Sequence, residues 1–328
     1  MTRARISLSL LLAIALALPL LAFPVSARAQ SCSFSASDVV LGQVDVLGSS
    51  ATDATGEISI SCASFLGLLS SINIQIHLGE GQAGLSGGLR RMTSPSTATG
   101  LRYDLYRDAS RSQMFGGSYG AHGGQPVQLT GASILTLLTT TTMKVPVYAR
   151  APGGQSDVAP GSYSSVFNRN PLDVRVDYRT CNLLLLCVDR TATFGFTVRA
   201  QVLPDCRVLA DDLDFGTRGL LTQQVDASSR IRVTCTAGSS YAVGLGYGLY
   251  GGSVNDRHMR SLAGHLIGYQ LFRDAGRSLR WGLAADGLNA ISAGTGATQD
   301  FTVYGRVPAQ TTPPPGAYSD TVVVTVTY

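Results

Sequence analysis

The sequence predicts an all-β protein of two tandem β-sandwiches, the second of which lacks its final strand. Short stretches of alternating apolar and polar residues recur along the chain, and no long stretch has apolar residues at helical spacing. Several features occur twice in the same order, which indicates an internal repeat. One alternating strand of the first copy has no counterpart in the second copy.

Residues 1–29 predict a secretory signal rather than a folded element. Arg3 and Arg5 form its basic end, an apolar run covers 6–21, and small residues flank Arg28 in a cleavage site before Gln30. The mature protein is therefore expected to be exported. No later segment has the roughly 18 consecutive apolar residues of a transmembrane helix.

The charge of the chain gives no reason to expect a nucleic-acid or anionic-membrane partner. The formal net charge is +4, and the signal holds three arginines and no acid, so the mature chain is nearly neutral. After removal of the signal, about 300 residues remain, which is enough for two domains with proper cores.

The two copies align at five places, and the boundary between them is expected at Pro204, which interrupts a strand pattern. This gives a first domain at 30–203 and a second domain at 204–328. Tyr and Val residues in the anchors are expected in the cores, and Arg and Asp residues at strand ends. The anchors are Cys32 with Cys206, 57–62 with 230–235, 103–108 with 269–274, 147–150 with 303–306, and 160–163 with 315–318.

Six cysteines in an exported chain predict three disulfides. Cys32 and Cys62 are 30 positions apart, Cys206 and Cys235 are 29 apart, and Cys181 and Cys187 flank a short turn. The sequence permits about fifteen pairings of six cysteines. The repeat favours these three pairs.

The second copy ends in a strictly alternating strand over 321–328. Its counterpart in the first copy, over 172–178, is followed by the cysteine-flanked turn and a return strand over 193–202. The second copy is therefore expected to accept a strand from another protein, because an open sheet edge over a core invites one. The residues expected to form this acceptor edge are Val322, Val324, Val326 and Tyr328.

An ordered set of residues in the second copy resembles the spore coat protein U domain. These residues are Cys206, Asp214-Phe215-Gly216, Cys235, Arg260, the runs 269–274, 281–282, 303–306 and 315–320, and the final Thr325-Val326-Thr327-Tyr328. The resemblance is strong over 205–328 and looser over 31–202.

The resemblance implies immunoglobulin-like sandwiches, and a subunit of an archaic chaperone-usher pilus that is similar to the two-domain tip adhesins. The implied partners are a periplasmic chaperone that fills the open edge, an outer-membrane usher, and the next pilus subunit, whose strand replaces that of the chaperone. Only Gln30 and Ser31 are expected to precede Cys32 after cleavage, too few to donate a strand. We therefore expect a place at the pilus tip, on the cell surface.

Motifs for catalysis, cofactors or metals are weak, so neither an enzyme nor a cofactor is expected. The run 246–251 fits a dinucleotide pattern and 84–88 and 116–120 fit a nucleophile pattern, but none lies between a strand and a helix. Scattered carboxylates that pair as in a glycosidase stay an open alternative. The four histidines have no metal-ligand spacing: His77, His122, His258 and His265.

Three apolar segments of the first copy lie where turns are expected, and they are candidates for contact with a hydrophobic surface. The alternative is that they are ordinary core. The resemblance favours exposure, because related tip adhesins are thought to present apolar loops. The candidates are Phe65, Leu66, Leu68, Leu69, Ile134, Leu135, Leu137, Leu138, Leu183, Leu184, Leu185 and Leu186.

The expected function is attachment to surfaces and biofilm formation by a pilus tip adhesin. One alternative is a lectin-like tip that binds a specific glycan. Attachment by such a tip would be blocked by a particular sugar, whereas attachment through apolar contact would be blocked by detergent. A second alternative is a structural spore or envelope coat protein, whose gene would have no chaperone and usher genes beside it.

Overall fold

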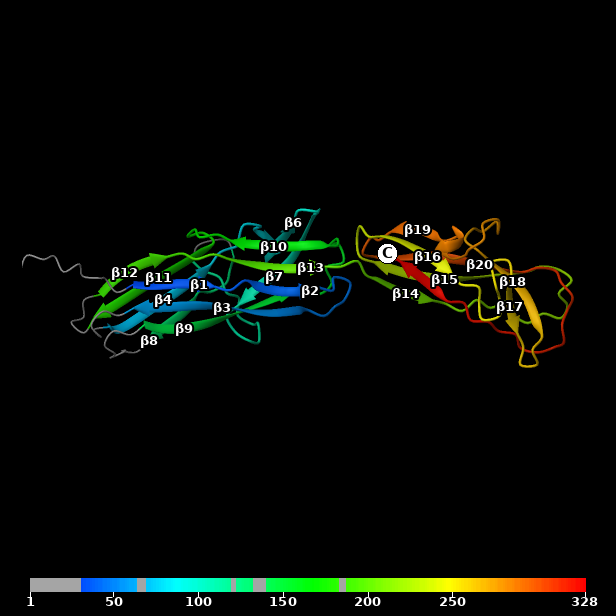
Figure 1. Ribbon diagram of the computed structural model, residues 1–328, viewed down its shortest axis with the longest axis horizontal. Coiled ribbons are helices and arrows are strands. Elements are labelled where there is room, and N and C mark those ends of the chain that lie inside the picture. Colours follow the sequence, from blue (N-terminus) through cyan, green and yellow to red (C-terminus); the bar gives the residue numbers. More distant parts are fainter. Residues whose placement is uncertain (1–30, 64–68, 119–121, 132–139, 183–186) are drawn as a thin grey trace, which may run out of the picture.

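The computed structural model is an elongated, nearly all-β molecule in which two groups of sheets lie end to end (Figure 1). The structure describes residues 31–63, 69–118, 122–131, 140–182 and 187–328. We call 31–202 the first unit and 206–328 the second unit; each encloses its own hydrophobic core. The all-β prediction is confirmed, whereas a domain boundary at 203 and 204 stays a prediction.

The first unit forms two sheets. In the described residues one sheet has the order β1-β3-β9-β7-β6-β10-β13-β2, with β5 beside β6, and the other has the order β12-β11-β4-β8. The strands are β1 (Ser31–Ala36), β2 (Val39–Gln43), β3 (Thr52–Ala63), β4 (Leu69–Leu78), β5 (Leu85–Ser86), β6 (Leu89–Ser94), β7 (Thr97–Tyr106), β8 (Val127–Gly131), β9 (Thr140–Ala151), β10 (Gly161–Phe167), β11 (Val174–Asn182), β12 (Cys187–Ala192) and β13 (Phe196–Val202).

The second unit repeats this plan with fewer strands. Its described sheets have the orders β14-β15-β20-β18-β17 and β19-β16-β21. The elements are β14 (Cys206–Ala210), β15 (Val225–Cys235), β16 (Ser240–Leu245), β17 (Arg257–Arg260), β18 (Leu266–Phe272), the single-turn 3-10 helix η2 (Ala284–Asp286), β19 (Ala290–Ala293), β20 (Thr298–Val307) and β21 (Val324–Thr327).

The repeat anchors occupy matching places in the two units. Tyr103 and Tyr269 are buried in their cores, as are Val147 and Val303. A buried arginine also recurs: Arg90 donates hydrogen bonds to the carbonyls of Gly79, Leu78 and Phe115, and Arg257 to those of Gly246, Leu245 and Trp281. Positions of the two units can therefore be compared one by one.

Three disulfides tie strand ends together. Cys32 is bonded to Cys62 and Cys206 to Cys235, in each case between the first strand of a unit and its neighbour. Cys181 is bonded to Cys187, which joins the facing ends of β11 and β12. These are the pairs that the repeat favours.

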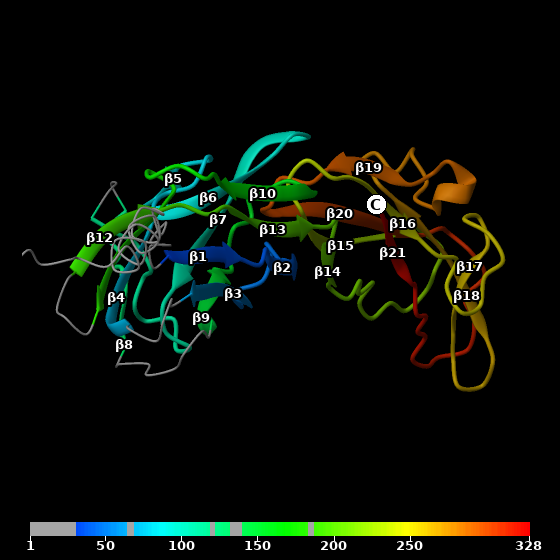
Figure 2. The same cartoon turned by 60° about the vertical axis from the view of Figure 1, so that its left-hand side comes forward.

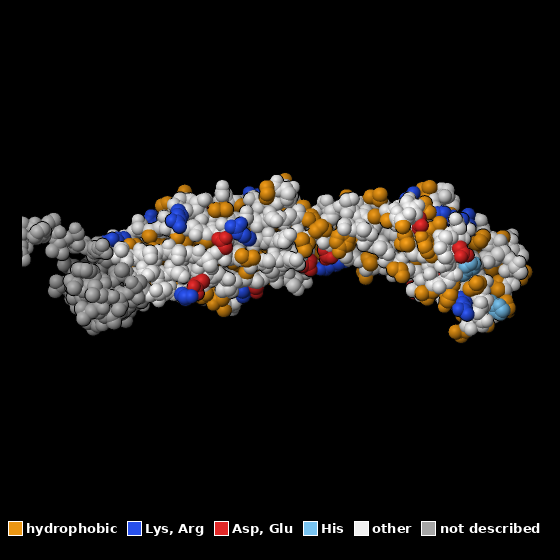
Figure 3. All heavy atoms as spheres, in the orientation of Figure 1, with side chains coloured by type: hydrophobic (Ala, Val, Ile, Leu, Met, Phe, Trp, Pro, Cys, Tyr) orange, Lys and Arg blue, Asp and Glu red, His pale blue; other side chains and the backbone are white. Residues whose placement is uncertain are grey.

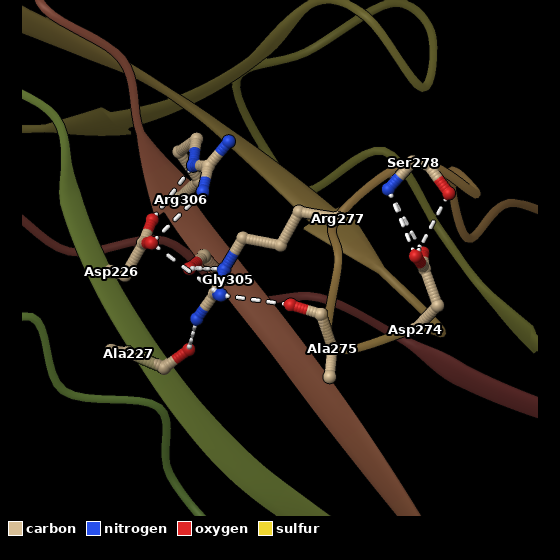
Figure 4. Close-up of polar contacts among 8 residues, drawn as sticks. All are labelled: Asp226, Ala227, Asp274, Ala275, Arg277, Ser278, Gly305 and Arg306. Atoms are coloured by element: carbon tan, nitrogen blue, oxygen red, sulfur yellow. Dashed lines mark hydrogen bonds and ion pairs between the residues drawn. The ribbon is translucent and has the colours of Figure 1, made fainter.

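An arginine in a left-handed turn fastens the sheet of each unit. Arg277, with φ 56°, donates to the carbonyl oxygens of Gly305 on β20 (3.2 Å) and Ala227 on β15 (3.4 Å) (Figure 4). Arg111 has the same φ and makes the matching bonds to Ala149 and Ala54. Positive φ is uncommon for residues other than glycine, so its recurrence at both arginines indicates that the two units share this turn conformation.

An aspartate–arginine pair beside each of these turns predicts a pH dependence of stability. Arg306 donates two hydrogen bonds to Asp226, at 2.7 and 2.9 Å, and Arg150 does the same to Asp53 (Figure 4). These bonds lower the pKa of both carboxyls. Because a lowered pKa favours folding only while the carboxyl is ionised, this stabilisation should be complete above the ordinary carboxyl pKa of about 4 and be lost as pH falls through the lowered value.

Urea unfolding over a pH series tests this dependence. Replacing Asp53 and Asp226 with Asn should reduce the loss of unfolding free energy on acidification, and replacing the exposed Asp157 should not. An unchanged slope in the double variant would show that these pairs contribute nothing.

Two strand predictions need correction. The alternation over 172–178 placed Leu172 on the apolar face, but β11 begins at Val174 and Leu172 is 74% exposed, because it lies in the turn before the strand. The return strand predicted over 193–202 is β13, which begins at Phe196 and is preceded by β12 on the edge of β11.

Candidate strand-acceptor groove

Two strand edges of the second unit are open on the same side of the molecule. β21 pairs with β16 from Leu245 and Val324 to Ala242 and Thr327, and β14 pairs with β15. Within the described residues no strand pairs with the other edge of either. Figure 2 shows β14 and β21 near each other, with loops of the second unit beside them.

The space along these edges is an apolar groove. It consists of two adjoining hollows of about 500 and 710 Å³, which share Leu213, Phe215, Met259 and Tyr318. One wall is the stretch 211–221 that follows β14, and the other is 312–324. Figure 3 shows that hydrophobic side chains are more frequent on the visible face of the second unit than on that of the first.

The first wall has a counterpart that is a strand in the first unit. Val39 and Leu41 lie on β2 and are 1% and 6% exposed, whereas the matching Leu213 and Phe215 are half-buried and belong to no strand. β2 is hydrogen-bonded to β13, and the second unit has no described strand in that place. The wall therefore lacks the partner that makes β2 a strand.

The second wall also matches a paired strand. β10 pairs with β13 along its whole length, from Gly161 opposite Val202 to Phe167 opposite Phe196. Residues 316–322 correspond to β10: Tyr318 donates its hydroxyl to the Pro314 carbonyl at 2.7 Å, as Tyr163 does to Ala159. On one side this stretch bridges to β17 through Ser319 and Arg260, as β10 does to β6. On the side where β13 lies in the first unit, no strand pairs with it in the described residues.

The floor of the groove is formed by the core of the second unit. Tyr269 reaches across it and donates its hydroxyl to Asp320 at 2.6 Å, and burial together with this bond raises the pKa of the tyrosine. The ring of Phe215 lies 6.3 Å from that of Tyr269. Leu213 and Phe215 lie over Gly305 on β20, where a Cβ would approach their side-chain atoms to 2.7 and 2.9 Å. Glycine at 305 therefore leaves room for both side chains.

The strand that fills the same space in the first unit is β13. It lies between β10 and β2, antiparallel to β10 and parallel to β2. Phe196, Val198, Ala200 and Val202 point inward and are buried, while Thr197 and Gln201 alternate with them on the outside. The groove of the second unit is therefore shaped for an alternating strand of this kind.

Of the predicted acceptor edge, Val322 and Val324 line the groove. Val322, Val324 and Val326 are half-buried against the second core, whereas Tyr328 is 56% exposed. The sequence-based prediction did not include the wall formed by 211–221 or the start of the wall formed by 312–324. The signal for the wall at 211–221 was the alternation of Leu213 and Phe215, which lie as far after Cys206 as Val39 and Leu41 lie after Cys32.

The predicted surface-contact residues lie outside the described residues, apart from the backbone of Leu69 at the start of β4. The described strand ends that flank the three apolar segments pair with one another. The pairs are Ala63 with Thr140, Asn182 with Leu69, and Gly131 with Ile72. These flanking strand ends therefore lie together at one end of the first unit, which in Figure 1 is the end away from the second unit.

Among the residues that the structure describes, no group of three or more His, Cys, Asp or Glu side chains could hold a metal ion. None of the described helices has the length and hydropathy needed to span a membrane.

Comparisons with known proteins agree with this architecture. The model of the Spore Coat Protein U domain family matches residues 20–169 and 192–325. Protein U of Myxococcus xanthus is 33% identical over 154 residues, which cover 42% of this chain and 86% of that protein. A chain in the crystal structure of the CsuC–CsuE chaperone–tip adhesion subunit pre-assembly complex, from archaic chaperone-usher Csu pili of Acinetobacter baumannii, has a TM-score of 0.50. It is 19% identical, covers 91% of this chain and is itself covered completely, and this likeness shows the fold alone.

Proposed function

The chain belongs to the Spore Coat Protein U domain family, and from this premise we propose that it is the tip adhesin of an archaic chaperone-usher pilus. Proteins of this family are structural rather than enzymatic, in agreement with the weak catalytic motifs of the sequence. The solved structure with the same fold is described as a chaperone–tip adhesion subunit complex of such a pilus. We extend that role to this chain.

The observation that carries the proposal is the difference between the two units. β13 completes the first unit from within the chain, and the matching groove of the second unit is open in the described residues. An incoming strand would run antiparallel to 316–322 and parallel to 213–217, as β13 does beside β10 and β2. We propose that a periplasmic chaperone supplies this strand first. At an outer-membrane usher, a strand of the next subunit then replaces the strand of the chaperone.

The two ends of the molecule support the proposed tip position. The partner strand would enter the second unit, and the strand ends that flank the three apolar segments lie at the opposite end of the first unit. A pilus attached at the groove would therefore hold these segments outward. Contact of several leucines with a hydrophobic surface needs no pocket, and many pili would add avidity. Attachment and biofilm formation are the proposed result.

Filling the groove from within the chain tests this function in piliated cells. A copy of residues 188–202 joined after Tyr328 by a short turn should compete with the chaperone and the next subunit, so the protein should disappear from pili. The same fusion with Asp at the positions of Val198 and Val202 cannot fill an apolar groove and should still assemble. Normal display of the first fusion on pili would refute the proposed partners.

A glycan-binding tip is the second candidate function. Blocking of attachment by detergent, with no effect of a panel of sugars, supports apolar contact. Blocking by one sugar alone supports the lectin.

A further inference from the structure

One carboxylate of the first unit contacts both the backbone and a side chain of the strand that fills its groove. Asp38 Oδ1 accepts a hydrogen bond from the backbone N–H of Thr197 at 2.8 Å. Asp38 Oδ2 accepts hydrogen bonds from the Arg199 guanidinium at 3.1 and 3.2 Å. Thr197 and Arg199 both lie on β13, with their side chains on its outer side. Asp38 therefore binds a backbone N–H and a guanidinium on the outer side of β13, which the apolar core does not contact.

Asp212 occupies the matching position on the wall of the open groove. The stretch from Cys32 to Gly42 aligns with 206–216 without a gap, and both terminal glycines have a φ of 70°. The residue before each aspartate makes the same bond to the neighbouring strand at 2.9 Å, from Ser37 to the carbonyl of Glu57 and from Asp211 to that of Arg230. The backbone thus places Asp38 and Asp212 alike.

The neighbours of Asp212 have partners of their own, whereas Asp212 has none within the described part of the chain. Asp211 accepts hydrogen bonds from Arg232, and Asp214 accepts one from the backbone N–H of Gly216. Asp212 is exposed at the groove and makes no hydrogen bond or ion pair with a described residue. Its carboxylate is free for an incoming strand.

We propose that Asp212 is a recognition residue for the donor strand. This proposal rests on the proposed function. Asp212 accepts one backbone N–H of the donor and pairs with an arginine two residues further along, because a guanidinium matches a carboxylate in charge and in shape. In the register of β13 this arginine lies opposite Ser319, the counterpart of Ser164. The partner is therefore a strand with alternating apolar residues and an outward arginine at that place.

Peptide binding to the full-length chain tests the proposal. The probe is a synthetic peptide with the sequence of residues 194–202, and its analogue carries Gln at the position of Arg199. We expect the analogue to bind about three- to tenfold more weakly, since an exposed charge pair contributes modestly. The variant Asp212→Asn should bind the parent peptide more weakly by the same factor. This variant should bind the Gln analogue and the parent peptide with equal affinity, because the interaction is already absent. Asp157→Asn, at an exposed position of the first unit away from the groove, is the matched control and should bind as the unaltered chain does.

The possible outcomes distinguish a failure of the role of Asp212 from a failure of the proposed strand-accepting groove. Failure of the parent peptide to bind would overturn both the groove and the role of Asp212. If the parent peptide binds but the Gln analogue binds equally well, the groove stands and the role of Asp212 is overturned. The same conclusion follows if the Asp212→Asn variant binds the parent peptide as tightly as the unaltered chain does. Losses that add in the double combination would also refute it, because two groups in direct contact share one interaction.

Discussion

A strand supplied in the same chain should raise the stability of the second unit by several kcal/mol. The change is a copy of residues 188–202 joined after Tyr328 by a short turn, so that its last seven residues lie along 316–322 as β13 lies along β10. Each Val or Phe side chain that becomes fully buried contributes roughly 1.5 to 3 kcal/mol. Ordering the added residues offsets part of this gain. The measurement is the unfolding of the second unit in urea, followed by the fluorescence of Trp281 in its core.

The fusion with Asp at the positions of Val198 and Val202 is the control for added length. It should leave the unfolding midpoint near that of the unaltered chain, because a charged residue cannot be buried without a partner. Without any added strand, residues 204–328 expressed alone should aggregate, whereas residues 31–203 should fold. A cooperative, highly stable fold of 204–328 alone would mean that no strand is missing.

Polar replacement of Leu183, Leu184, Leu185 and Leu186 should sharply reduce attachment to hydrophobic plastic while the stability of the first unit changes little. In the sequence the four leucines lie between the end of β11 and the disulfide-bonded Cys187, and these two flanks are at the end of the first unit away from the groove. If they are a contact tip, Ser at these positions removes apolar area available to the surface. If they are core, the same change should cost several kcal/mol through lost burial and cavities. Thermal unfolding of the purified chain and attachment of piliated cells distinguish the two cases.

A matched control lies at the other end of the molecule. Leu262 is fully exposed in the turn between β17 and β18, and replacing it with Ser should change neither stability nor attachment. Replacing Phe65, Leu66, Leu68 and Leu69 should weaken attachment in the same direction as the change at 183–186. Normal attachment by a stable polar variant at 183–186 would favour the glycan-binding tip.

The fold could be predicted from the sequence because its signals are local or repeated. Alternation identifies half-buried strands such as β13 and β15, and the doubled anchors align the two units. The spacing of the cysteines then favours the disulfide pairs. These signals need no knowledge of which strands are neighbours.

The groove could be predicted only in part, because strand pairing is a long-range property. The alternation of 321–328 indicated an open strand but did not show which elements lie across from it. Leu213 and Phe215 follow two aspartates, are separated by Asp214 and precede a glycine, so the stretch has the composition of a turn. Their place in the groove depends on the pairing of β2 with β13 at the matching position, which joins residues far apart in the sequence. Whether the apolar segments are exposed stays a prediction, since they lie outside the described residues.

We propose that the second unit has an open place for a strand, in the position that β13 fills in the first unit. Amide hydrogen exchange of the full-length chain, localised by mass spectrometry, tests it most directly. We expect rapid exchange at 213–217 and 316–322 in the chain alone, apart from Ser319, whose N–H donates to the Arg260 carbonyl. Both stretches should be protected when the copy of residues 188–202 is joined after Tyr328. The matching stretches of the first unit, Val39–Gln43 and Gly161–Phe167, should be protected in both proteins. Equal protection of the two units without any added strand would contradict the account.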